Sequence, residues 1–208
     1  MGEIKKYELT SETKVIYGKT LFRIKALISF GSVKAGESGG FIEKEENLDH
    51  KGNAWVYENA LVYENAKVCG NAKVCGNALV YENALVYENA LVCGNAWVCG
   101  NAKVYENALV YENALVYGNA KVCGNAKVCG NALVYENADY ATVKGFGSCF
   151  RCTTFFRCKD KMIRVVCGCF YGTIDEFKSK VRETHKDTKI AKEYLMIADL
   201  MEMHFAEE

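Results

Sequence analysis

Alanine and valine recur at fixed places along the middle of the chain. From residue 53 to residue 136 the hexapeptide Asn-Ala-x-Val-x-x is repeated fourteen times without an insertion or a deletion. A strict six-residue period does not hold one apolar stripe in step on a helix with 3.6 residues per turn, whereas short strands joined by tight corners accommodate it. Ala and Val of one hexad are two residues apart in a strand and point the same way, so we expect both inside and the residue between them outside. The pattern predicts a parallel β-helix in which each hexad forms one side of a coil.

The hexads resemble those of the left-handed β-helix hexapeptide-repeat proteins, in which an aliphatic residue is followed four positions later by a small one. Val56 and Ala60 keep that spacing, and Val62 and Ala66 keep it again. The resemblance implies a left-handed β-helix with three hexads, or eighteen residues, in each coil. Tyr or Cys follows the valine where this family usually has a small or acidic residue, so a right-handed solenoid stays the alternative.

A second resemblance covers nearly the whole chain. It rests on a Gly-Gly-Phe-Ile-Glu lead-in at residues 39–43, on the tract of Gly-Asn-Ala hexads, and on a small C-terminal module around Cys-Gly-Cys-Phe at residues 167–170. These features are similar to those of uncharacterised proteins of bacteriophages and prophages. The resemblance implies a viral protein in the cytoplasm of an infected or lysogenic bacterial host, and it brings no activity with it.

The segments on either side of the tract have patterns of their own. Strand-like runs at 14–17 and 21–27, separated by a Gly-Lys pair, predict an N-terminal β-hairpin cap over residues 1–31. Because an open solenoid end exposes apolar core and unpaired backbone, such a cap is expected. We place the β-helix at 32–138, since Ile42, Leu48 and Ala54 already keep the six-residue phase, which is lost after residue 138.

Residues 139–208 form the predicted C-terminal α+β module. Its runs at 150–158 and 162–171 are rich in β-branched and aromatic residues, which favours a hairpin. Thr173 and Glu176 have the spacing of a capping box, which predicts a helix start, and a second helical pattern follows the first. The module is expected either to cover the end of the solenoid or to be a recognition domain held on a rigid stalk.

Three hexads per coil place outward residues eighteen apart above one another, in three ladders. The first ladder reads Trp55, Lys73, Leu91, Leu109 and Lys127, and the third is mostly lysine. The second is apolar along its whole length and is flanked by tyrosines, and a twofold axis brings such a ladder onto its own copy. We therefore predict a homo-oligomer, with a dimer favoured; a host protein partner, or coverage by the protein's own terminal segments, are the alternatives. The predicted interface consists of Leu61, Leu79, Trp97, Leu115, Leu133, Tyr63, Tyr81, Tyr117 and Tyr135.

A basic and aromatic stretch lies in the C-terminal module. Basic side chains interleaved with aromatic rings contact phosphates and stack on bases, so a nucleotide or nucleic-acid site is one interpretation. A hairpin with one solvated face explains the same alternation. The residues predicted to contact an anionic ligand are Arg151, Arg157, Lys159, Lys161 and Arg164.

The cysteines are expected to be reduced thiols. The chain has eleven, and six of them recur in hexads at the place where Tyr otherwise stands. Cys149, Cys152, Cys158, Cys167 and Cys169 are spaced only partly as in a zinc ribbon, because one residue and not two separates the last pair. We therefore predict no metal and no cofactor.

Charge and composition narrow the classes of function. The 26 basic residues match the 26 acidic ones, so no net charge steers the chain to nucleic acid or membrane. The sequence favours neither a transmembrane helix nor a signal peptide, and a cytoplasmic protein is expected. Residues 53–138 contain no His, Ser or Thr, so no catalytic constellation is found there.

We predict a non-enzymatic scaffold that acts through protein–protein contacts. The main alternative is an inhibitor of a host defence or signalling process that binds a protein or nucleotide ligand near the C-terminal module. A hexapeptide-repeat acyltransferase is the third hypothesis.

Overall fold

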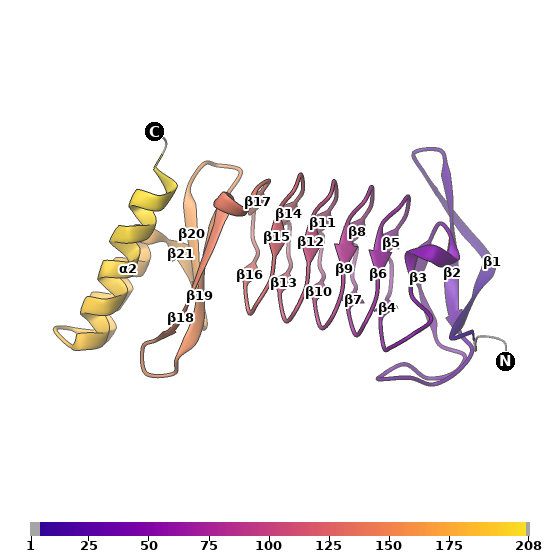
Figure 1. Ribbon diagram of the computed structural model, residues 1–208, viewed down its shortest axis with the longest axis horizontal. Helices are drawn as coiled ribbons and strands as arrows, with labels where there is room; N and C mark the ends of the chain where they lie inside the picture. Colours follow the sequence, from indigo (N-terminus) through magenta and orange to yellow (C-terminus); the bar gives the residue numbers. More distant parts are fainter. Residues whose placement is uncertain (1–4, 207–208) are drawn as a thin grey trace.

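A computed structural model describes residues 5–206 as an elongated molecule whose middle is a parallel β-solenoid (Figure 1). Residues 1–4 and 207–208, the outermost parts of the predicted N-terminal cap and C-terminal module, lie outside the described residues, as does the start of the chain considered for a signal peptide. Each hexad forms one two-residue strand, and each strand pairs in register with the strand eighteen residues further, as Val92 does with Val110. The coil strands are β4 (Trp55–Val56), β5 (Leu61–Val62), β6 (Lys67–Val68), β7 (Lys73–Val74), β8 (Leu79–Val80), β9 (Leu85–Val86), β10 (Leu91–Val92), β11 (Trp97–Val98), β12 (Lys103–Val104), β13 (Leu109–Val110), β14 (Leu115–Val116), β15 (Lys121–Val122), β16 (Lys127–Val128) and β17 (Leu133–Val134).

The core of the solenoid is the column of alanines and valines that the hexad pattern predicts. Every hexad alanine and valine is at most 1% exposed. The lead-in keeps the same phase, because Ile42 and Leu48 are also buried and stack on the coils through Val62 and Val68. The predicted mainly β solenoid is therefore confirmed.

The corners of the coils are held by two repeated side-chain bonds. Asparagine amides donate to the asparagine eighteen residues further, for example from Asn71 to Asn89 at 3.0 Å. The last residue of each hexad from Glu58 to Gly130 has a left-handed backbone, with φ of 60° at Glu64 and 59° at Glu88. This conformation costs an L-residue about 1 kcal/mol or more. The Glu64 and Glu88 carboxylates offset part of that cost, because each accepts the N–H of the equivalent residue one coil on, at 2.9 and 2.8 Å.

The N-terminal hairpin continues one face of the solenoid. Strand β1 (Tyr7–Ile16) pairs with β2 (Lys19–Ala26), and β2 pairs with β3 (Ser38–Ile42), which lies beside β5. The strand order of this sheet is β1-β2-β3-β5-β8-β11-β14-β17. A short 3-10 turn, η1 (Glu45–Asn47), follows β3. The hairpin thus covers the open backbone edge of the first coil.

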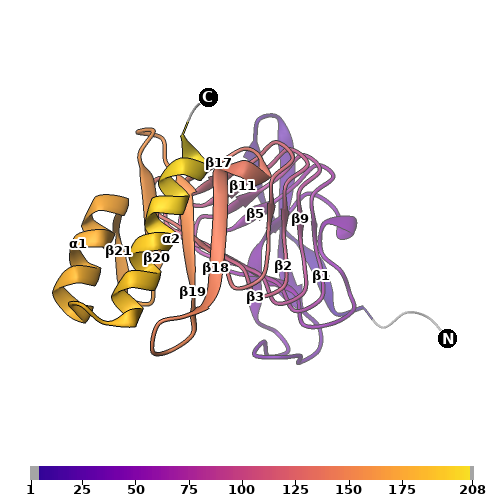
Figure 2. The same cartoon turned by 60° about the vertical axis from the view of Figure 1, so that its left-hand side comes forward.

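The C-terminal module is a separate sheet with two helices on one side. Turn η2 (Asn137–Asp139) leads into an antiparallel sheet of β18 (Tyr140–Phe146), β19 (Arg151–Arg157), β20 (Ile163–Cys167) and β21 (Phe170–Thr173). Helices α1 (Ile174–His185) and α2 (Lys189–Phe205) follow. Figures 1 and 2 show the sheet between the last coil and the helices. The predicted hairpin is present as β19 and β20, and two further strands extend it.

The capping box predicted for the first helix of this module is present. The Thr173 hydroxyl accepts the Glu176 N–H at 3.2 Å, and the Glu176 carboxylate accepts the Thr173 N–H at 2.7 Å, so the capping box is confirmed. Strand β19 alternates, with Phe155 packed among the helices and Phe156 packed into the solenoid core. Within residues 5–206, no helix combines the length and the continuous hydrophobicity needed to span a lipid bilayer.

Candidate functional site

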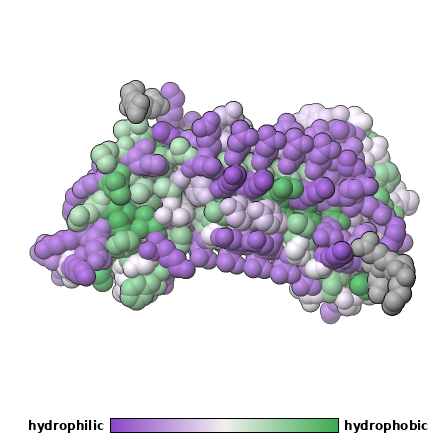
Figure 3. Space-filling model, viewed as in Figure 1, coloured by the Kyte–Doolittle hydropathy of each residue, from purple (hydrophilic) through white to green (hydrophobic). Residues whose placement is uncertain are grey.

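The apolar ladder predicted from the sequence is assembled by the solenoid. Leu61, Leu79, Trp97, Leu115 and Leu133 are direct register partners in successive strands of one sheet. In the view of Figure 3 most of the solenoid surface is hydrophilic, because the corner asparagines and glutamates project outwards. Every rung of this ladder is apolar, whereas the other two ladders contain lysines.

The first rung of the ladder is covered by the protein itself. Leu61 is 4% exposed and Tyr63 is 3% exposed, and both pack in one cluster with Leu21 of β2 and Phe41 of β3. These two side chains are not accessible to a partner, which corrects the expectation of a fully free face. The hairpin meets the solenoid on this face, so an outward direction in the repeat did not mean exposure.

The same covering occurs at the start of the first ladder. The outward residue Trp55 is fully buried, with its ring centroid 5.3 Å from that of Phe30 and 6.0 Å from that of Tyr7. Lys6 is buried beside it and donates to the Ala54 carbonyl at 2.9 Å. Burial lowers the pKa of Lys6 to about 8. The N-terminal segment therefore closes two faces of the first coil.

The rungs that stay accessible centre on Trp97. Its side chain is 43% exposed, whereas Leu79, Leu115 and Leu133 are half-buried. Next to Trp97 the surface has a hollow of about 300 Å³ between the ladder and the tip of the hairpin, where Tyr17 is 87% exposed. The hollow is lined by Tyr17, Tyr63, Glu64, Leu79, Tyr81, Glu82 and Trp97. An exposed ring and a partly apolar hollow thus lie side by side on one face.

The flanking tyrosines form a row beside this ladder. Tyr63 and Tyr81 stack almost parallel at 5.1 Å between ring centroids, and Tyr117 and Tyr135 lie 4.8 Å apart in a tilted pair. Tyr135 is 46% exposed at the last coil. Burial raises the pKa of Tyr63 to about 12. Aromatic surface is therefore exposed beside the ladder at Tyr135, whereas Tyr63 is buried.

Of the basic residues predicted to contact an anionic ligand, four lie at the turn end of the β19–β20 hairpin and one, Arg151, lies at the opposite end of β19. Arg157 lies 3.3 Å from the Asp139 carboxylate and donates to the Phe205 carbonyl at 2.9 Å. Arg164 pairs with Asp160 at 2.7 Å. Both arginines therefore already have an acidic partner within the chain.

In that set Arg151 is separated from the two lysines. Lys159 and Lys161 are exposed in the turn between β19 and β20. Arg151 lies at the opposite end of β19 and lines a cavity of about 460 Å³. Arg151 therefore belongs to a concave site.

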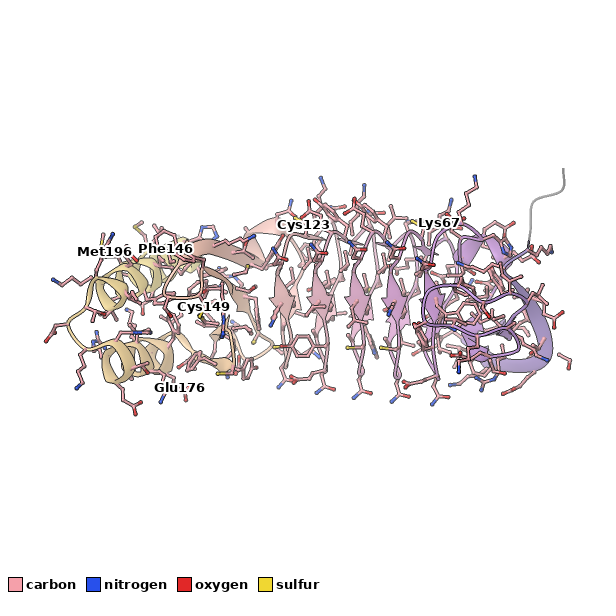
Figure 4. All side chains as sticks on the ribbon, turned by 90° about the horizontal axis from the view of Figure 1, so that it is seen from below. Lys67, Cys123, Phe146, Cys149, Glu176 and Met196 are labelled. Carbon is pink, nitrogen blue, oxygen red and sulfur yellow. The ribbon has the colours of Figure 1, made fainter. Side chains whose placement is uncertain are left out.

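This cavity lies within the C-terminal module, between the sheet and α1. Its apolar wall is made by Phe170, Phe177 and Val181, with Tyr194 of α2 beside them. Arg151 and Lys180 supply its cationic lining, with His185 beside them, and three thiols also line it: Cys149, Cys167 and Cys169. Figure 4 shows Cys149 beside the helices of the module and away from the coils that carry Cys123. The sequence analysis missed Lys180 and His185 as site residues, because nothing in helical spacing connects them to the β18–β19 turn.

A chain of hydrogen bonds fixes the inner wall of the cavity. The Thr153 hydroxyl donates to Cys167 Sγ at 3.2 Å, and that thiol lies 3.8 Å from the Tyr194 hydroxyl. The Tyr194 hydroxyl in turn donates to the Phe146 carbonyl at 3.3 Å. Burial raises the pKa of Tyr194 to about 12, so this hydroxyl stays protonated and acts as a donor.

Of the five cysteines considered for zinc, Cys152 is half-buried and the other four are divided between the two sides of the sheet. Cys149, Cys167 and Cys169 line the cavity, whereas Cys158 packs in the solenoid cluster. Burial raises the pKa of Cys158 to about 11, which keeps it a thiol. Among the described residues no group of three or more His, Cys, Asp or Glu side chains is placed to hold a metal ion.

Helix α2 exposes a second apolar surface that the sequence analysis did not single out. Met196 is 71% exposed, Leu200 is 50% exposed and Met203 is 70% exposed. Their spacing of four and three residues puts them on one stripe, opposite the buried face of the helix. Figure 3 shows hydrophobic surface over this end of the molecule.

Comparison with known proteins supports the solenoid and no more. A sequence profile described as YdcK Beta solenoid repeat matches residues 72–88, a stretch inside the hexad tract. No curated protein matches the chain. Residues 72–88 are thus similar to the YdcK β-solenoid repeat.

Proposed function

We propose that this protein is a non-enzymatic scaffold that self-associates as a dimer through the accessible rungs Leu79, Trp97, Leu115 and Leu133. The observation that carries the proposal is the position of Trp97, 43% exposed at an inner rung of an apolar ladder. An aromatic residue near the centre of an interface is most fully desolvated and contributes most to binding. Covering the ladder with another apolar surface is therefore favourable.

A second copy of the chain is the occupant that fits this surface. The exposed Trp97 ring and the hollow beside Tyr17 lie on the same face of one chain. A twofold axis brings each ring opposite the hollow of the other copy, which is the self-complementarity that an isologous interface requires. The scaffold would then be a pair of rods joined side by side.

The other two faces of the solenoid are poorer surfaces for self-pairing. On the first, Trp55 is buried, and lysines at 73 and 127 flank the two remaining leucines. On the third, Lys103 and Lys121 are direct register partners. Pairing either face with its own copy brings like charges together, which is unfavourable. Charge therefore selects the second face.

The test is a set of substitutions on matched faces. Replacing Leu79, Trp97 and Leu115 together by lysine should give a folded monomer, because burial of a large side chain contributes about 1.5 to 3 kcal/mol when complete. The same change at Leu91 and Leu109 should leave the dimer in place. Sedimentation velocity at micromolar concentration measures both results. A wild-type protein that sediments as a monomer would exclude self-association and favour a foreign partner on this face.

The cellular setting that we propose is the cytoplasm of an infected or lysogenic bacterial host. Its support is the resemblance of the lead-in, the hexads and the C-terminal module to those of phage and prophage proteins. Transcript measurements on a lysogen before and after induction test it, and expression that does not change would contradict a role in the viral cycle.

A further inference from the structure

We propose that the cavity of the C-terminal module binds a small anion attached to an aromatic ring. The cavity has a volume of about 460 Å³ and lies between the sheet and α1, far along the molecule from the hairpin end of the apolar ladder. Pockets that bind small molecules have this size and combine apolar walls with a few polar groups. The inference does not depend on self-association.

The charge of the lining selects an anion. Arg151, Lys180 and His185 line the cavity, and no acidic side chain does so among the described residues. Lys180 is compensated by Glu183 at 2.8 Å, on the outer side of α1. Within residues 5–206 the Arg151 guanidinium forms no hydrogen bond and no ion pair, in contrast to Arg157 and Arg164. A free guanidinium binds carboxylate, phosphate or sulfonate oxygens in a bidentate manner.

The backbone around Arg151 keeps its guanidinium at the cavity. Gly168, between β20 and β21, has a φ of 64°, and a Cβ atom there would collide with Arg151 Nη1. The guanidinium therefore lies over the glycine, where a side chain would displace it. The turn that holds Gly168 also carries Cys167 and Cys169, so the cation and the thiols are placed by one short segment.

The apolar wall selects the ring. The centroids of Phe170 and Phe177 are 5.5 Å apart, and those of Phe177 and Tyr194 are 5.6 Å apart. Phe177 of α1 and Tyr194 of α2 are buried in the core of the module, so their ring planes are fixed before a ligand arrives. Aromatic ligands gain by stacking or edge contact with such rings. The anionic group then lies at Arg151, and the ring lies against Phe170 and Phe177.

The alkylation rate of the cavity thiols measures whether a ligand occupies the cavity. Cys149 and Cys169 are exposed at its lining, so both react with an alkylating reagent in the free protein. A ligand in the cavity shields them. Cys129 is 2% exposed in the solenoid cluster, where burial raises its pKa to about 11, so it stays unreacted in either case.

The probe for the test is 8-anilinonaphthalene-1-sulfonate, an aromatic anion. Its fluorescence should rise in a saturable manner, and it should slow the alkylation of Cys149 and Cys169 by iodoacetamide, measured by mass spectrometry. Arg151→Gln should weaken both effects about tenfold, the loss expected for one charge-assisted bond. Lys159→Gln, which removes a lysine outside the cavity, should change neither.

Two further measurements separate the cavity from the other apolar surfaces. The neutral analogue N-phenyl-1-naphthylamine should bind the wild type and Arg151→Gln equally, because it lacks the sulfonate. The variant with Leu79, Trp97 and Leu115 changed to lysine should keep the protection of Cys149, so failure of the proposed dimer leaves this result intact. Equal protection in Arg151→Gln and the wild type, or fluorescence without any protection, would overturn the proposal.

Discussion

The two ends of the solenoid are both closed by antiparallel strands, but in different ways. At the N-terminal end the hairpin joins the solenoid's own sheet edge to edge, through β2 and β3. At the C-terminal end a separate four-stranded sheet lies across the last coils, attached by a bridge between Ala132 and Cys158 and by a bond from the Lys127 N–H to the Thr154 hydroxyl at 3.0 Å. The N-terminal hairpin continues the backbone hydrogen bonding of the solenoid sheet. The C-terminal sheet covers the end of the solenoid instead.

The difference also appears in the cores. Tyr7 and Ile24 of the hairpin belong to the same buried cluster as the valines of the coils. The C-terminal module contributes Phe156 and Val166 to that cluster, but it has a second cluster of its own around Phe177. The N-terminal cap is therefore part of one cooperative body with the coils, whereas the C-terminal module is stabilised partly by itself.

The largest effect should come from a charge at the N-terminal junction. Ile42→Asp puts a carboxylate in a site with no exposed surface, at the strand that joins the hairpin to β5, and an uncompensated buried charge costs about 3 to 5 kcal/mol. Because cap and coils share one core, a single unfolding transition should move to lower denaturant. Circular dichroism during urea unfolding measures it. Two separate transitions in this variant would contradict a shared core.

A matched pair of phenylalanines tests the other end. Phe155 and Phe156 are neighbours in β19, both fully buried, but they face the helices and the solenoid respectively. Each change to Ala should cost about 3 to 5 kcal/mol in the unit that it touches. Hydrogen exchange should show faster opening of α1 and α2 in Phe155→Ala, and faster opening of β16 and β17 in Phe156→Ala. Identical exchange patterns would mean that the module and the coils open together.

The smallest expected effects are pH-dependent and have opposite signs at the two ends. At the C-terminal junction burial raises the pKa of Cys129 and Cys158 from an ordinary value of 9.0 to about 11. Between these pH values the unfolded state loses protons that the folded state keeps, so the free energy of unfolding falls as pH rises, by about 2 to 3 kcal/mol for each thiol over the whole window. Urea unfolding with a phosphine reductant should show a smaller loss when both cysteines are changed to Ala.

At the N-terminal junction the sign reverses. Burial lowers the pKa of Lys6 from 10.5 to about 8, so between these values the unfolded state binds a proton that the folded state lacks. The free energy of unfolding then rises with pH, by up to about 3 kcal/mol from this group. Relative to the wild type, Lys6→Met should gain less stability between pH 8 and 10. A parallel pH dependence of the two proteins would show that Lys6 is solvated.

The residues of the apolar ladder could be predicted from the sequence, but their exposure could not. The repeat gave the direction of Leu61 and Trp55 correctly as outward, yet both are buried because segments outside the tract cover them. Spacing within a repeat reports which side of a strand a residue lies on. It carries no information about a hairpin that arrives from elsewhere in the chain.

The cavity shows the same limit more strongly. Arg151 was singled out with other basic residues because they are close in sequence, but it lies at the opposite end of β19 from the other four. Lys180 and His185, which line the cavity together with Arg151, come from α1. Residues of β19 and α1 line one cavity because the helix packs on the sheet, which spacing along the sequence does not report.

The sequence by itself determined the solenoid, the inward column of Ala and Val, the ladder order and the capping box of α1. These features follow from local spacing, since a six-residue period with small and branched residues satisfies backbone bonding and packing in one way along the whole tract. Tertiary structure alone decided which rungs stay exposed, where Lys6 is buried and which side chains line the cavity. Those outcomes depend on contacts between segments far apart in the chain, whose free energy arises from burial between elements and not from the preference of any one of them.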